Sequence, residues 1–255
     1  MSRLFTFGCS FTKYMYPTWA DLVATNFDFY ENWGGAGGGN TFISTQLYEC
    51  NQQRNITKDD TVLIMFSSFT RYDFIIDSNW KLSGNLYSQT NINFDFLENC
   101  WSEEHGYVSS WFAIKSAINL LDNIGCNYKI MTAFDLLRFS ENITKSMDDI
   151  RTNRVKNCMD DFKTILPAIN LLDYAEYLED NDIVKFYRYF RNGKLDKDRH
   201  PTLTMHLMWV KDVLPQFHNE KMDEMVKEWE TWITTSENEI SNKFRNIVDK
   251  GEPKR

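Results

Sequence analysis

Two patterns of hydrophobic residues alternate along the first part of the chain, one typical of strands and one typical of helices. Short apolar runs at 3–7, 27–33 and 61–67 have the length of strands, and the last of them is continuously apolar. Such a run is typical of a parallel strand that helices cover on both faces. The stretches 19–26 and 40–51 carry apolar residues at helical spacing instead. Strands that alternate with helices predict βαβ units and a mostly parallel sheet.

The same alternation continues through the middle of the chain, with interruptions. An amphipathic helix is predicted over 108–124 and a fourth strand over 127–134. Two insertions, 71–107 and 135–167, break the rhythm, and long connections of this kind are often lids or binding loops. The first insertion is rich in aromatic side chains, and the second is more charged and is expected to be helical in its later part. The apolar stretch 168–172 is expected to supply a last short strand.

The C-terminal part of the chain has an amphipathic pattern of its own. From 222 to 247, apolar residues recur at helical spacing with polar residues between them, which predicts one long helix or two shorter ones. The apolar stripe must bury against something. It packs on its own domain, or it mediates self-association or docking to a partner through 219–248. We therefore divide the chain into an α/β domain, 1–217, and a C-terminal helical extension, 218–255.

Composition and charge narrow the class of protein. The chain has 255 residues, 42% of them hydrophobic, which suits one large α/β domain. Its net charge of −8 disfavours binding to a nucleic-acid backbone, because such binding requires clustered Lys and Arg. No apolar run is long enough for a membrane span or a signal peptide, so we expect a cytoplasmic protein. The five cysteines are scattered without a CxxC pair, which favours reduced thiols over disulfides or structural zinc.

Acyl transfer is the chemistry that the remaining polar positions suggest. It requires a nucleophile, a base that accepts the nucleophile's proton, and donors that face the developing oxyanion. In a parallel α/β sheet these groups converge beyond the carboxyl ends of the strands. Ser10 follows the first strand and Gly8, the glycine-rich turn 34–39 follows the second, 67–71 follows the third, and His200 precedes a predicted helix.

Three of these segments resemble the sequence blocks of SGNH (GDSL-like) hydrolases. Phe7-Gly8-Cys9-Ser10 is similar to the first block, which usually reads Gly-Asp-Ser. Asn32-x-Gly34-x-x-Gly37 resembles the second block, and Asp198-x-His200-Pro201 resembles the last. The order and spacing match over most of 1–217, and the variant looks like that of phage-encoded members. The resemblance implies a flavodoxin-like three-layer α/β/α sandwich with about five mostly parallel strands.

The resemblance also assigns roles to individual residues. It implies that Ser10 is the nucleophile and His200 the base, with Asp198 as the acid that orients the base. Asp196 is the alternative acid: the family usually reads Asp-x-x-His, whereas this chain has Asp at two and at four residues before His200 and Lys197 at three. The amides of Ser10 and Gly37 are expected to bind the oxyanion. The family acts without a metal, and we expect no metal or cofactor here.

The chain departs from the family pattern at two blocks. Cys9 stands where the family has Asp, as a buried filler or as a nucleophile in its own right. The third block normally reads Gly-x-Asn-Asp, and its Asn donates to the oxyanion, but 67–70 contains no Asn. Ser68, Thr70 or Arg71 is the candidate substitute, and the sequence does not choose among them.

Two functions follow as alternatives. The first is a serine esterase that hydrolyses a short-chain ester through a Ser-His-Asp acyl-enzyme mechanism, with O-acetyl groups on carbohydrate as the preferred substrate class. The aromatic insertion 71–107 would then stack on sugar rings. The second is a catalytically degenerate SGNH-like protein used for binding or assembly, such as a virion component if the chain is phage-encoded. The missing block residues favour the second alternative.

Overall fold

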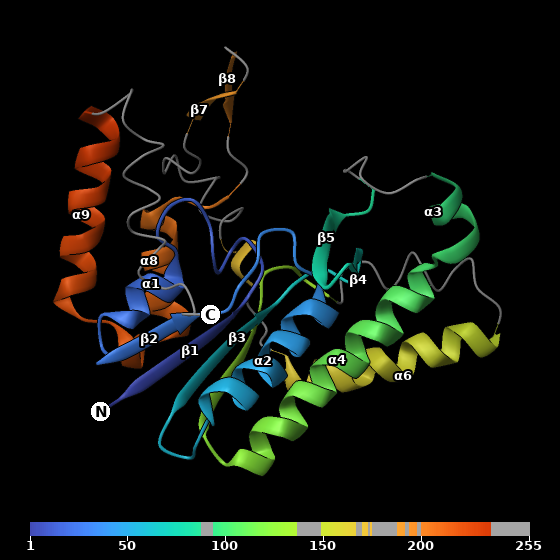
Figure 1. The fold of residues 1–255 in the computed structure, drawn as a ribbon. Helices are drawn as coiled ribbons and strands as arrows, with labels where there is room; N and C mark the ends of the chain where they lie inside the picture. Colours follow the sequence, from blue (N-terminus) through green and yellow to red (C-terminus); the bar gives the residue numbers. More distant parts are fainter. Residues whose placement is uncertain are drawn as a thin grey trace.

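The structure is a computed structural model. It describes residues 1–87, 94–136, 149–166, 170–172, 174, 188–191, 194–197 and 200–235. A parallel four-stranded sheet lies at its centre, in the order β2 (Phe29–Asn32), β1 (Arg3–Gly8), β3 (Thr61–Phe66) and β6 (Asn127–Thr132) (Figure 1). The predicted mostly parallel α/β sheet is confirmed.

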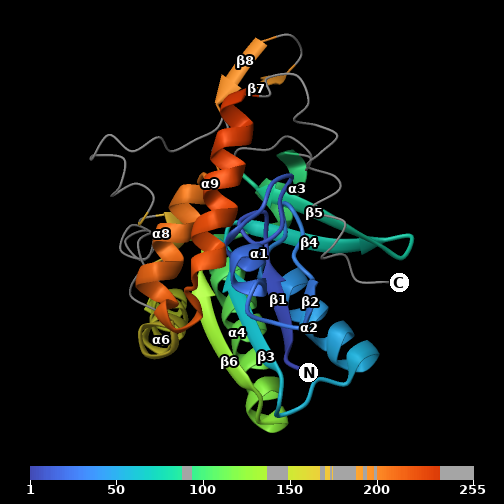
Figure 2. The same cartoon turned by 90° about the vertical axis from the view of Figure 1, so that its left-hand side faces the viewer.

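Helices cover both faces of the sheet, in three layers (Figures 1 and 2). Alternate strand residues face opposite layers, as the pleat of a strand requires. One face packs Leu4, Leu63, Met65 and Met131 under α1 (Trp19–Ala24), α8 (Leu203–Val213) and α9 (Glu220–Thr235). The other packs Phe5, Phe7, Val62, Ile64 and Phe66 under α2 (Asn40–Arg54), α4 (Glu103–Ile124) and α6 (Asp149–Ile165).

Helix α4 begins five residues earlier than its apolar pattern suggests. The Ser102 side chain accepts a hydrogen bond from the His105 amide at 3.1 Å and caps the helix. Glu103 and Glu104 lie in the first turn, where carboxylates interact favourably with the helix dipole. The helix ends at Gly125, whose φ of 73° suits a left-handed C-terminal cap.

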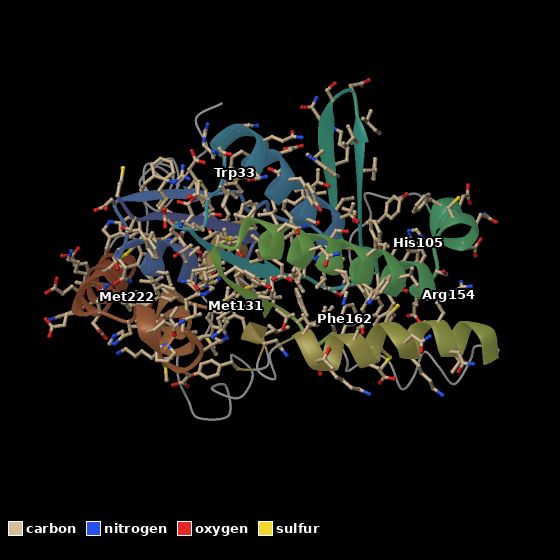
Figure 3. The ribbon with its side chains drawn as sticks, turned by 90° about the horizontal axis from the view of Figure 1, so that it is seen from below. Trp33, His105, Met131, Arg154, Phe162 and Met222 are labelled. Atoms are coloured by element: carbon tan, nitrogen blue, oxygen red, sulfur yellow. The ribbon has the colours of Figure 1, made fainter. Side chains whose placement is uncertain are left out.

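The first insertion contains a β-hairpin that the sequence pattern did not reveal. Strands β4 (Arg71–Ile76) and β5 (Asn79–Asn85) pair antiparallel around a turn in which Asp77 and Ser78 both have positive φ. Such a turn matches the twist of a two-residue hairpin. Figure 3 shows the hairpin projecting from the body of the protein. The short helix α3 (Phe94–Cys100) follows before α4.

The prediction of a strand at 168–172 is wrong for the residues described there. Leu171 and Leu172 are helical, and the Leu172 amide donates to the Ala133 carbonyl at 3.0 Å, just beyond β6. An apolar run this short fits a buried helical turn as well as a strand. A separate antiparallel pair, β7 (Arg188–Arg191) and β8 (Lys194–Lys197), was not anticipated.

Helix α9 packs on its own domain through the described part of the C-terminal region. Met222, Val226 and Trp229 are buried in the cluster that α1 and α8 share. Residues 236–255 lie outside the described part, so self-association through 219–248 stays a prediction. Among the described residues, no helix combines the length and apolar character needed to cross a membrane.

Candidate active site

The carboxyl ends of three neighbouring strands bring the candidate segments to one edge of the sheet. The parallel register pairs Thr6 with Asn32 on one side of β1 and Gly8 with Met65 on the other. Ser10 comes two residues after β1 ends, the glycine-rich turn 34–39 starts just after β2, and 67–71 starts just after β3. The segments that follow β2 and β3 therefore flank Ser10.

A tight turn presents Ser10 directly after β1. The Cys9 carbonyl accepts hydrogen bonds from the amides of Thr12 at 2.9 Å and Lys13 at 3.0 Å, so the chain reverses around Ser10. A Cβ atom at Gly8 would lie 2.0 Å from the Thr12 hydroxyl oxygen, and glycine is therefore required there. Cys9 is fully buried, as expected of a filler rather than a nucleophile.

Ser10 and His200 meet across 190 residues of chain. The Ser10 Oγ and the His200 Nε2 are 2.8 Å apart, within the range for proton transfer to a general base. Ser10 is 6% exposed and His200 is partly buried. The structure brings together the two residues on which the predicted chemistry depends.

The turn that carries Ser10 also holds His200. The Tyr14 ring stacks on the imidazole, with centroids 3.9 Å apart and planes inclined by 23°. The Tyr16 hydroxyl donates to the backbone carbonyls of His200 and Pro201, at 3.2 and 3.3 Å. Sequence reasoning missed both tyrosines, and their only signal is their position a few residues after the nucleophile.

The acid of the predicted triad is not placed. Asp198 lies outside the described residues, and Asp196 is described only as part of the backbone of β8. A second histidine lies near the base: His206 on α8 is 1% exposed, and burial, followed by the charge of His200, lowers its pKa to about 3. His206 is therefore neutral. Within the described ranges, no cluster of three or more His, Cys, Asp or Glu residues is arranged to hold a metal ion.

The glycine-rich turn crosses the end of β1 beside Ser10. The Gly35 amide donates to the Gly8 carbonyl at 3.0 Å, and the Gly34 amide donates to the Asn32 side chain at 3.0 Å. Gly37 has φ of 83°, a conformation that favours glycine. Its amide makes no hydrogen bond within the described part of the chain.

The candidate oxyanion substitutes after β3 are engaged with other protein groups. The hydroxyls of Ser68 and Thr70 are buried and lie 2.8 Å apart, in a hydrogen bond to each other. Arg71 donates through Nη1 to the Gly38 carbonyl at 2.8 Å, and its guanidinium lies 5.4 Å from the Phe134 ring centroid. Their roles at an oxyanion stay predictions, but Arg71 clearly contacts the glycine-rich turn.

Asn40, the first residue of α2, joins this turn to the end of β3. Its side chain accepts from the Ser67 amide at 2.7 Å and donates to the Ser67 carbonyl and the Ser110 hydroxyl, each at 3.0 Å. It is 2% exposed. Sequence reasoning missed Asn40, although an asparagine directly after a glycine-rich turn is a signal that could have been followed.

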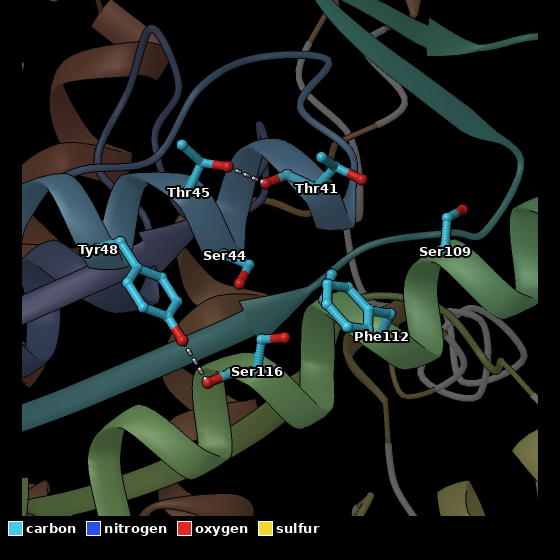
Figure 4. Close-up of a pocket in the computed structure, with 8 residues that line it drawn as sticks. Thr41, Ser44, Thr45, Tyr48, Ser109, Phe112 and Ser116 are labelled. Carbon is cyan, nitrogen blue, oxygen red and sulfur yellow. Dashed lines mark hydrogen bonds between the residues drawn. The ribbon is translucent and has the colours of Figure 1, made fainter. Parts of the chain in front are cut away.

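A groove between α2 and α4 lies apart from these residues (Figure 4). Its volume is about 400 Å³, and the Tyr48 hydroxyl donates to the Ser116 carbonyl across it at 3.1 Å. None of the candidate site residues lines it. The groove is lined by Thr41, Ser44, Thr45, Tyr48, Ser109, Phe112, Ala113 and Ser116.

Fold and site together define an α/β protein with a serine–histidine pair at the carboxyl edge of a parallel sheet. The sequence matches no family model and no curated protein. Among solved structures, a member of the lipolytic protein G-D-S-L family from Veillonella parvula is similar at 12% identity and a TM-score of 0.44, over 84% of this chain and 97% of that one. A protein named as an acylhydrolase from Bacteroides fragilis is similar at 12% identity and a TM-score of 0.37, over 88% of each chain.

Proposed function

We propose that the protein is a serine hydrolase of the SGNH type that cleaves short-chain esters. The observation that carries this proposal is the 2.8 Å separation between the Ser10 Oγ and the His200 Nε2. A serine hydroxyl becomes an effective nucleophile when an adjacent base accepts its proton. Gly37 supports the proposal, because its amide has no partner among the described residues and lies in the turn beside the nucleophile.

The mechanism is a two-step acyl transfer. His200 takes the proton from Ser10 as Oγ bonds to the ester carbonyl carbon, and the amides of Ser10 and Gly37 stabilise the oxyanion. The imidazolium then gives this proton to the alcohol oxygen as the ester C–O bond breaks. Water attacks the acyl-enzyme, losing a proton to His200, which returns a proton to Ser10 when the carboxylic acid leaves. Asp198 would orient the base through the other ring nitrogen.

Carbohydrate O-acetyl esters are the substrate class that we favour. Partly exposed rings gather where the β4–β5 hairpin meets α3 and α4, and aromatic rings stack on sugars through their apolar faces. The Tyr72 ring centroid lies 5.0 Å from that of Phe96 and 6.0 Å from that of Trp101. His105 joins the group 5.6 Å from Trp101.

A binding or assembly role, as in a virion component, is the second candidate. It is favoured by the third-block hydroxyls of Ser68 and Thr70, which bond to each other instead of standing free for an oxyanion. Losing one oxyanion donor costs roughly 2.7–4 kcal/mol of transition-state stabilisation. On this reading the Ser10–His200 pair would be a remnant without turnover.

Turnover of p-nitrophenyl acetate and of acetylated glycans separates the two candidates. The esterase proposal expects turnover that Ser10→Ala abolishes and that Ser116→Ala, which changes a serine in the groove far from the site, leaves unchanged. Labelling of Ser10 by a fluorophosphonate provides a second readout. Background release by the wild type and by both variants, with no labelling of Ser10, would refute the enzyme and favour the assembly role.

A further inference from the structure

Asp73, the third residue of β4, caps helix α2 from a distant part of the chain. Its carboxylate accepts from the Gly39 amide at 3.0 and 2.9 Å and from the Phe42 amide at 3.1 Å, 34 and 31 residues away. The helix has no side-chain cap of its own, because its N-cap residue is Gly39. A carboxylate is well suited to this place, where the first amides of a helix lack partners.

The carboxylate approaches the glycine-rich turn so closely that only glycine fits opposite it. A Cβ atom at Gly39 would lie 2.7 Å from the Asp73 Oδ2 and 2.9 Å from the Arg71 Cβ. The side chains at the base of the hairpin are therefore packed directly against the backbone of the turn. This explains a glycine at position 39, where a catalytic loop alone would not require one.

Two further contacts from the hairpin hold the same turn. Arg71 donates to the Gly38 carbonyl at 2.8 Å, and the Gly84 amide donates to the Gly37 carbonyl at 3.1 Å. The Gly38 amide itself donates to the Gly35 carbonyl at 2.9 Å. Two peptide groups, one between Gly37 and Gly38 and one between Gly38 and Gly39, are thus each held by hydrogen bonds at both the N–H and the C=O.

The preceding peptide group carries the amide that matters for catalysis. The N–H of Gly37 belongs to the peptide group between Ala36 and Gly37, and it makes no hydrogen bond within the described residues. Its direction follows from the peptide groups after it, because Gly37 adopts a conformation with φ of 83°. Donors of an oxyanion hole must be aimed before the reaction begins.

We infer that Asp73 is a positioning residue for acyl transfer, which holds the glycine-rich turn so that the Gly37 amide faces the oxyanion. The inference rests on the proposed function. It makes the base of the β4–β5 hairpin a part of the catalytic apparatus. Asp73 touches neither the substrate nor the reacting atoms, and it acts through the backbone of the turn.

The charge of Asp73 gives the inference a distinctive pH signature. Burial raises the pKa of Asp73 to about 6, although the amides of Gly39 and Phe42 and the charge of Arg71 act in the opposite direction. Arg71 is on the same strand, α2 contributes its amides, and the pairing residue on β5 is Leu82. Protonation weakens the hold on the turn, because charge-assisted hydrogen bonds are about twice as strong as neutral ones.

Stability and activity should respond in opposite directions when this charge is removed. The folded pKa lies above the ordinary value of 3.8, so ionisation of Asp73 opposes folding above about pH 6. Asp73→Asn should therefore melt no lower than the wild type at pH 8. Its neutral amide oxygen can still accept from Gly39 and Phe42, as Oδ2 does, but these hydrogen bonds lose their charge assistance, so the turn is held less firmly. A residue that only stabilises the fold would behave in the reverse way.

The experiment compares Asp73→Asn with Asp77→Asn, the same change at an exposed carboxylate in the turn of the same hairpin. At pH 8 we expect kcat for p-nitrophenyl acetate to fall about 10- to 100-fold in Asp73→Asn, the range for a displaced catalytic group, with KM little changed. Asp77→Asn should match the wild type. The ratio of the wild-type kcat to the Asp73→Asn kcat should fall as the pH drops through about 6, because protonation of Asp73 removes the advantage of the wild type. Taking the ratio removes the effect of ionisations that both proteins share, such as that of the base.

Amide hydrogen exchange of residues 34–42 supplies a readout that does not depend on turnover. Faster exchange in Asp73→Asn than in Asp77→Asn is expected. Equal exchange, or an unchanged kcat in a folded Asp73→Asn, would overturn the inference, and so would a lower melting temperature with full activity. If the wild type shows no Ser10-dependent turnover while exchange still responds to Asp73→Asn, the proposed function fails and the hold on the turn stands.

Discussion

Replacing Asn40 by alanine tests how firmly the glycine-rich turn is tied to the end of β3. The side chain is 2% exposed and satisfies both the amide and the carbonyl of Ser67, at 2.7 and 3.0 Å. The Ser110 hydroxyl, which accepts from the Asn40 amide at 3.0 Å, is left out of the sum, so only the two backbone groups of Ser67 are counted. A buried polar group left without a partner costs about 1–3 kcal/mol, which gives about 2–6 kcal/mol for the two groups exposed by Asn40→Ala.

Urea unfolding followed by the fluorescence of the eight tryptophans measures this loss. For a chain of this size the same loss lowers the melting temperature by roughly 4–24 °C. Asn79→Ala is the control, because that exposed side chain makes one hydrogen bond, to the Asp77 carbonyl at 2.8 Å. It should stay within about 0.5 kcal/mol of the wild type. A comparable small effect for Asn40→Ala would refute the reasoning.

Three further predictions concern the base, the turn and the sheet. Tyr14→Leu should lower kcat more than Tyr14→Phe, because only leucine removes the ring that stacks on His200; equal rates would contradict this. Gly37→Ala should destabilise the protein by about 1–2 kcal/mol in urea unfolding, the cost of a side chain in the left-handed region. Burial raises the pKa of Asp60, but its hydrogen bonds with Arg3 and Thr57 outweigh burial and hold the pKa below 3.8. The pair therefore contributes stability at neutral pH that is lost as pH falls below about 4, and Asp60→Asn should flatten that loss.

The strands and the edge at which they end could be predicted from the sequence because burial on both faces leaves a clear signal. The run 61–67 is apolar from Val62 to Phe66, and β3 occupies Thr61–Phe66 with every residue buried. Once parallel strands are predicted, their carboxyl ends must share an edge, and that alone brings Ser10 near the segments after β2 and β3. Pairing Ser10 with His200 needed one more step, the likeness of 198–201 to the last SGNH block.

The side chains that support the pair were beyond sequence reasoning. Twelve tyrosines are present, and apart from their place just after the nucleophile nothing in the sequence indicates that Tyr14 and Tyr16 contact His200. Whether a tyrosine contacts His200 depends on the path of the turn, and the pattern of hydrophobic residues does not describe that path. Asp73 is a similar case, because it lies in an insertion whose hairpin was not predicted, and its partners lie before β3.

Residues 67–70, which contain no asparagine, lead from the end of β3 directly into the β4–β5 hairpin. The base of this hairpin returns to the glycine-rich turn. A guanidinium from Arg71, a carboxylate from Asp73 and an amide from Gly84 all reach residues 37–39. Because these groups come from both strands of the hairpin, β4 and β5, no short sequence motif could reveal them. A missing residue in one block therefore says little about activity until the course of the neighbouring chain is known.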